Sequence, residues 1–119
     1  MTPEKLKDFA TKTLDSHKAE DIVTIDLKGK SSLTDYMIIA TGKSSRQVTA
    51  MAKKLREAFG DKGLTVRTEG LDNGDWAVVD AGDVIIHIFR PEVRDFYEPE
   101  KIWGVDYSAV DYTVFMSAS

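Results

Sequence analysis

The 119-residue sequence contains no cysteine, only two histidines and only three prolines. Without cysteine the chain cannot form disulfides, thiolate nucleophiles or the Cys-based sites that hold structural zinc. It also has no apolar run of about 18 residues, and no apolar segment follows a basic one near the N-terminus, so we expect neither a membrane span nor a secretory signal. These absences predict a cytoplasmic protein.

The chain also has fewer basic than acidic residues. The 16 Lys and Arg residues are outnumbered by 20 Asp and Glu residues, which gives a net charge of −4. Electrostatic binding to nucleic acid needs an excess or a patch of Lys and Arg, so we expect no direct sequence-specific contact with nucleic acid. The acidic balance fits a partner with a basic surface, although the same charge also serves solubility alone.

The composition that remains, 42% apolar and 30% charged, is typical of a globular protein rather than a disordered one. A chain of this length forms one domain with a real core. We place that domain at residues 1–103. After Gly104 the apolar spacing becomes irregular, so we expect residues 104–119 to form a loosely docked or disordered tail.

Apolar periodicity predicts three helices and five strands. The helices are expected at residues 3–17, from residue 45 to a stop at Gly60 or Gly63, and at residues 91–97. The strands are expected at residues 22–27, 36–40, 64–68, 76–80 and 83–89. Thr2 should cap the first helix, and Ser44 with Gln47 the second. A further turn is expected at residues 100–103.

This order of elements predicts a mixed five-stranded sheet with helices packed on it, of the α/β or α+β class. The strand, helix and strand around residues 44–59 predict a right-handed parallel crossover. Four consecutive apolar residues at 37–40 favour burial on both faces and hence a central position for that strand in the sheet. The last two strands are expected to add an antiparallel edge.

These two strands, joined by Ala81 and Gly82, read as a β-hairpin. With that loop, Asp80 pairs with Asp83 and Trp76 with His87. Because side chains alternate along a strand, one face is uniformly aliphatic and should pack on helices. That face carries Ala77, Val79, Val84, Ile86 and Ile88. The other face is mixed and is the better place to look for function; it carries Trp76, Val78, Asp80, Asp83, Ile85, His87 and Phe89.

The turn Thr41–Ser45 follows a strand and opens a helix, where free backbone N–H groups could hold a phosphate. It lacks the glycine spacing of a P-loop or a dinucleotide fingerprint. The next strand, Val66–Thr68, has no pair of carboxylates for the cations of a two-metal phosphoryl-transfer site. Ser44 is therefore interpreted first as a helix cap. A nucleotide-binding or nucleotidyltransferase-derived enzyme that uses this turn is the alternative function.

Metal binding and hydrolytic catalysis find little support. Glu69, Asp80, Asp83 and His87 are the possible ligands, but Asp83 and His87 are about 13 Å apart along a strand, too far to share one ion. Neither histidine has a nucleophile at a recognisable spacing. We therefore predict no metal, no cofactor and no catalytic residue.

Aromatic residues gather late in the chain. Seven of the 11 Phe, Trp and Tyr residues lie from Phe89 onward. The adjacent Phe96 and Tyr97 on a short helix cannot both point inward, and an exposed aromatic bordered by charge is typical of a protein-binding patch. A dimeric scaffold that uses the hairpin face to pair with itself is a third possibility.

Several motifs have the order and spacing of a known family. They are Thr34–Val48, Glu69–Gly70, Asp75–Phe89, Arg94–Glu98 and Glu100–Trp103. Over residues 4 to 103 the sequence closely resembles the ribosomal silencing factors, also called the Iojap-like family. The resemblance implies a fold akin to nucleotidyl transferases without their catalytic carboxylates, and a protein that is not an enzyme. The sequence departs from the family at Pro99, where an aliphatic residue is usual.

The resemblance also implies a function. Such factors bind the large ribosomal subunit through its ribosomal protein fourteen and sterically block joining of the small subunit, which lowers translation in nutrient limitation. By carry-over onto matching positions, the residues in or beside the contact surface are Trp76, Asp80, His87, Tyr97 and Trp103, with Glu69 supplying charge. We take Trp76 and Tyr97 as anchors, and Asp80 and Glu69 as electrostatic contributors.

Overall fold

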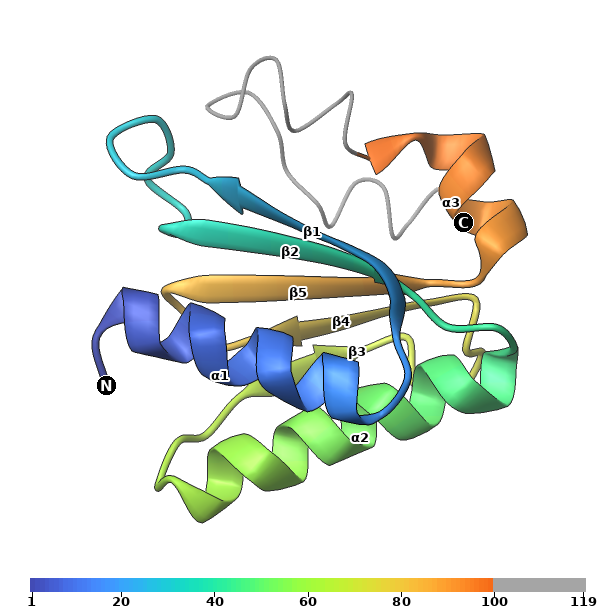
Figure 1. The fold of residues 1–119 in the computed structure, drawn as a ribbon, viewed down its shortest axis with the longest axis horizontal. Coiled ribbons are helices and arrows are strands. Elements are labelled where there is room, and N and C mark those ends of the chain that lie inside the picture. The colour runs from blue at the N-terminus through green and yellow to red at the C-terminus, as the bar shows by residue number, and fades with distance from the viewer. Residues whose placement is uncertain (100–119) are drawn as a thin grey trace.

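The structure, a computed structural model, describes residues 1–99. The elements follow the predicted order (Figure 1): α1 (Pro3–Ser16), β1 (Glu20–Asp26), β2 (Tyr36–Thr41), α2 (Ser45–Asp61), β3 (Arg67–Glu69), β4 (Trp76–Asp80), β5 (Val84–Phe89) and α3 (Pro91–Tyr97). The turn expected at residues 100–103 and the tail expected at 104–119 lie outside the described residues.

The strands form one mixed sheet in the order β1-β2-β5-β4-β3, which confirms the predicted class. Among the strands of residues 1–99, only the β2–β5 pair is parallel. The prediction that the hairpin forms an edge was wrong, because β5 lies at the centre and β3 and β1 are the edges. Both β2 and β5 are buried along their whole length, so each needs a neighbour on both sides. The chain after α2 therefore crosses to the far edge rather than pairing β3 with β2.

The hairpin register also differs from the prediction, by two residues. Trp76 pairs with Phe89 and Val78 with His87, and the Ala81 amide donates to the Val84 carbonyl at 2.9 Å. The two loop residues are thus Gly82 and Asp83. Gly82 has φ +83, a conformation that glycine adopts without strain. A shift of two residues keeps every strand side chain on its predicted face, since the side-chain period is also two.

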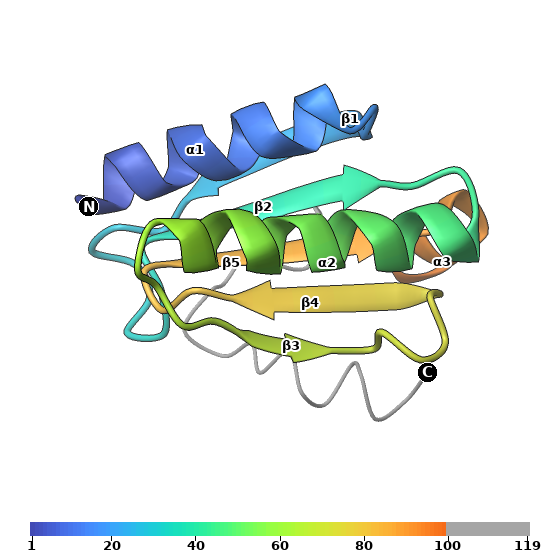
Figure 2. The same ribbon diagram turned by 90° about the horizontal axis from the view of Figure 1, so that it is seen from below.

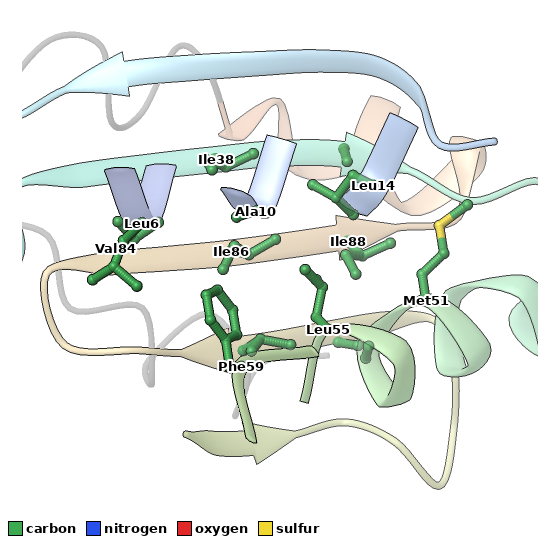
Figure 3. Close-up of a cluster of buried hydrophobic side chains, with 14 of the residues drawn as sticks. Leu6, Ala10, Leu14, Ile38, Met51, Leu55, Phe59, Val84, Ile86 and Ile88 are labelled. Atoms are coloured by element: carbon green, nitrogen blue, oxygen red, sulfur yellow. The ribbon is translucent and has the colours of Figure 1, made fainter. Parts of the chain in front are cut away.

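The aliphatic face packs on α1 and α2, as predicted (Figures 2 and 3). Leu6, Ala10 and Leu14 of α1 meet the sheet beside a stripe from α2: Val48, Met51, Ala52, Leu55 and Phe59. Both predicted N-caps are confirmed: Thr2 Oγ1 accepts the Lys5 amide and Ser44 Oγ accepts the Gln47 amide. Within residues 1–99 no helix has the length and apolar character needed to cross a membrane.

The opposite face of the sheet has a second core cluster, and α3 packs at one end of it. Its buried members are Leu27, Met37, Ile39, Trp76, Val78, Ile85 and Phe89. Val93 and Tyr97 from α3 contact this cluster while only partly buried. The mixed hairpin face thus meets α3, the short helix that carries the paired aromatic residues.

Candidate functional site

Helix α3 is only seven residues long, and Arg94 fixes it to the sheet. The Arg94 side chain is 9% exposed. Its Nη1 donates to the backbone oxygen of Asp21 and to Oγ1 of Thr41, both at 2.7 Å. Asp21 lies at the bulge in β1 with φ +49, and Thr41 ends β2. One guanidinium therefore ties α3 to two strands that precede it by more than 50 positions in the sequence.

A second cation holds the first turn of α3. Arg90 Nε lies 2.6 Å from Asp75 Oδ1, and the Arg90 amide donates to the Asp75 carbonyl at 3.0 Å. Arg90 Nη1 also pairs with Glu92 at 3.0 Å. Because Asp75 directly precedes β4, these bonds join the start of the hairpin to the helix that follows it. Such charge-assisted bonds give α3 a defined position on the sheet.

Beneath α3, Trp76 and His87 form a buried polar pair. Trp76 Nε1 donates to His87 Nδ1 at 2.8 Å, and the two residues are 2% and 0% exposed. Burial lowers the pKa of His87 from 6.5 to about 3, so the ring is neutral at physiological pH. Since Nδ1 accepts, the proton of the neutral ring is on Nε2. The indole also packs on Phe89 and Tyr97, with ring centroids 4.7 and 5.0 Å away.

The outward side of α3 is aromatic and acidic. Phe96 is 79% exposed and meets the Tyr97 ring edge-on at 5.0 Å. This confirms that the two rings do not both point inward. The flanking carboxylates are those of Glu92, Asp95 and Glu98, whereas the Arg94 charge points into the protein. We call Glu92, Asp95, Phe96, Tyr97 and Glu98 the α3 surface.

The structure brings together only part of the predicted site. Trp76, His87 and Tyr97 are in contact. Asp80 lies at the other end of β4, about 13 Å along the strand from Trp76, where its Oδ1 accepts the Gly82 amide. Glu69 is exposed on β3, opposite Val78.

Trp103 lies outside the described residues. The predicted set omitted Phe96, although its pairing with Tyr97 was a usable signal, and it omitted Arg94, which no local pattern distinguishes from a surface arginine.

The turn Thr41–Ser45 uses its backbone donors within the fold. The Gly42 amide donates to the Phe89 carbonyl at 2.9 Å, and the Lys43 amide to Gln47 Oε1 at 2.5 Å. A Cβ on Gly42 would lie 2.8 Å from a Val48 methyl carbon, so this glycine permits close packing of the turn on α2. These contacts favour the helix-cap interpretation over a phosphate cradle. In the described part of the chain no three His, Asp or Glu side chains gather as a metal site would require.

Comparison with known proteins identifies the family. The model of the family described as "Ribosomal silencing factor during starvation" matches residues 1–118, which extends the resemblance past residue 103. A ribosomal silencing factor of Zymomonas mobilis is 54% identical over 103 residues, which cover 86% of this chain and 77% of the relative. One from Haemophilus influenzae is 48% identical over 100 residues, covering 83% and 98%.

A solved structure agrees with the sequence matches. The crystal structure of a Chromobacterium violaceum protein superposes with a TM-score of 0.84 at 37% identity, covering 93% of this chain and 95% of that one. At this identity and coverage the likeness extends over the sheet and the helices on both of its faces. The chain belongs to the ribosomal silencing factor family.

Proposed function

We propose that this protein is a translational repressor of the cytoplasm that binds the large ribosomal subunit through ribosomal protein fourteen and blocks joining of the small subunit. It acts by occupying a surface, without catalysis. Its family membership supports the ribosomal role. The exposed Phe96 among carboxylates supports the α3 surface as the contact, and it is the observation that carries this assignment.

The α3 surface suits a basic ribosomal partner. A protruding aromatic ring can fill an apolar pocket, and hot spots of this kind dominate many interfaces. Carboxylates around the ring speed encounter with a Lys- and Arg-rich surface and orient it. The bonds of Arg94 and Arg90 hold the helix in place before binding, which reduces the entropy lost on association.

Residues beneath and beside α3 have supporting roles in this proposal. Trp76 is 2% exposed, so it acts through Tyr97, against which it packs, rather than as an exposed anchor. His87 fixes the indole by accepting its N–H. Glu69 and Asp80 lie at the β3–β4 side of the same sheet face and contribute to the negative potential there.

The test is sedimentation of the protein with separated large and small subunits, followed by subunit reassociation. Wild-type protein should sediment with large subunits and reduce reassociation. Phe96→Ala should lose about 2 kcal/mol of binding, roughly 30-fold in affinity, while its thermal stability stays unchanged. A pull-down with isolated ribosomal protein fourteen should show the same loss.

Leu33→Ala is the matched control, because Leu33 is also a large exposed hydrophobe, at 55%, but lies in the loop between β1 and β2. Equal affinity of the two variants would exclude the α3 surface. Failure of the wild type to sediment with large subunits would exclude the function. Stabilisation by a nucleotide with Mg²⁺ in a thermal-shift assay would favour the enzyme alternative, and a mass that rises with concentration in light scattering would favour the dimer.

A further inference from the structure

Helix α2 carries cations that form no ion pair with an acidic residue in the part of the chain that the structure describes. Its sequence has four basic side chains and two acidic ones, although the whole chain has a net charge of −4. Lys54 pairs with Glu57. Within residues 1–99, Arg46, Lys53 and Arg56 take part in no ion pair. The acidic total therefore conceals a local basic patch.

Two of these cations line a groove. It has a volume of about 440 Å³ and lies between the first half of α2 and the loop before β4. Its lining residues are Ser45, Arg46, Thr49, Ala50, Lys53, Leu71, Asp72 and Asn73. Arg46 and Lys53 are seven residues apart, so they lie on one side of the helix about 10 Å from each other along its axis. The small exposed Ala50 between them leaves room for a ligand to approach the helix.

The loop that forms the other wall is fixed to α2. Thr49 Oγ1 donates to the Leu71 carbonyl at 3.0 Å. Gly74 has φ +76, and a Cβ there would lie 2.5 Å from the Ser45 carbonyl oxygen, so only glycine allows this approach. Asn73 Oδ1 accepts the Asp75 amide, which leaves the Asn73 NH₂ group as a donor. The groove is thus preformed, with two cations along its helix side.

We propose that this groove binds the phosphate backbone of ribosomal RNA. Arginine, lysine and side-chain amides are common partners of phosphate oxygens, and such contacts position a protein without reading sequence. Asp72 is the one carboxylate among the lining residues, and it lies on the loop wall, so the phosphates would follow the α2 side. The contact is therefore compatible with the expected lack of sequence-specific nucleic-acid recognition.

The groove and the α3 surface lie at the same end of the sheet. Helix α2 begins where β2 ends and α3 begins where β5 ends, and these two strands are parallel (Figure 2). The loop before β4 reaches the same end, since β4 is antiparallel to β5. One ribosomal surface can therefore contact α3 through protein and α2 through RNA. This inference rests on the proposed function, which supplies the RNA.

The test is the salt dependence of affinity for large ribosomal subunits. The charge-reversal variant Arg46→Glu with Lys53→Glu is compared with the control Lys5→Glu with Lys12→Glu, which makes the same charge change at exposed positions of α1. Loss of two phosphate contacts should make the slope of log affinity against log salt shallower by about 1.5. The control should keep the wild-type slope.

A slope equal to that of the control would overturn the RNA contact and leave the proposed function intact. The groove variant should bind isolated ribosomal protein fourteen with wild-type affinity; a loss there would assign the groove to a protein contact instead. Phe96→Ala should weaken binding at every salt concentration with an unchanged slope. Retention of binding by Phe96→Ala would overturn the α3 assignment alone. Circular dichroism confirms that each variant is folded.

Discussion

Lowering the pH from 7 to 5 should destabilise the protein through the buried ring of His87. The pKa of this ring is about 3 in the folded protein, whereas the ordinary pKa of histidine, which applies in the unfolded chain, is 6.5. Below pH 6.5 the unfolded chain therefore takes up a proton that the folded protein does not bind. The free energy of unfolding must fall as the pH drops from 6.5 towards 3. Between pH 7 and 5 this loss comes to about 2 kcal/mol, because each pKa unit corresponds to about 1.4 kcal/mol.

Urea denaturation at the two pH values measures this loss, with His87→Gln as the test variant. Glutamine has no titrating group, and its carbonyl can still accept the Trp76 indole N–H. The variant should be less stable than the wild type at pH 7 but should lose about 2 kcal/mol less on acidification. His17→Gln is the control, since His17 is exposed at the C-terminal end of α1.

The control should lose as much stability as the wild type. If His87→Gln also loses as much as the wild type, within about 0.5 kcal/mol, the buried neutral ring is not the cause of the acid sensitivity. Fluorescence in a Trp103→Phe background, where Trp76 is the one tryptophan left, reports in the same titrations whether the pair stays intact until the protein unfolds.

Two further substitutions test the supports of the site. Gly74→Ala should cost about 2 kcal/mol or more of folding stability, because its Cβ would add a close contact with the Ser45 carbonyl to the strain of a left-handed backbone. Gly29→Ala is the control and should cost only about 1 kcal/mol, because Gly29 has φ +71 but open space around its Cβ. Equal costs in urea denaturation would disprove the close packing at Gly74. Thr41→Val removes an acceptor from the buried Arg94 and should cost about 1–3 kcal/mol. A cost below about 0.5 kcal/mol in the same assay would show that this bond does not hold α3.

Local patterns predicted the elements of this fold better than their arrangement. Helix caps and alternating faces depend on near neighbours, and Thr2, Ser44 and the two hairpin faces were correctly predicted. The hairpin register was wrong by two, because Ala81-Gly82 and Gly82-Asp83 are both plausible loops and both place the same residues on each face. Strand order was wrong in part because both apolar strands, β2 and β5, need a neighbour on each side, and local patterns do not show which strands supply those neighbours.

For the site as well, features that depend on near neighbours were predicted and contacts between distant residues were not. The split between Phe96 and Tyr97 follows from adjacency on a short helix and was predicted, whereas the burial of Trp76 depends on what packs over it and was not. Arg94 bonds with Asp21 and Thr41, and the sequence does not show that they meet. The likeness to nucleotidyl transferases and the boundary at residue 103 stay predictions.

The parallel pairing of β2 with β5 has a consequence for how the chain folds. Each β2 residue meets a β5 residue 48 positions later, as Tyr36 meets Val84. A nascent chain that ends before β5 therefore lacks the native partner for one hydrogen-bonding edge of β2. Such distant pairing slows folding and delays it until most of the chain has been synthesised. An unpaired strand edge of this kind is an aggregation hazard until β5 has been made and can pair with β2.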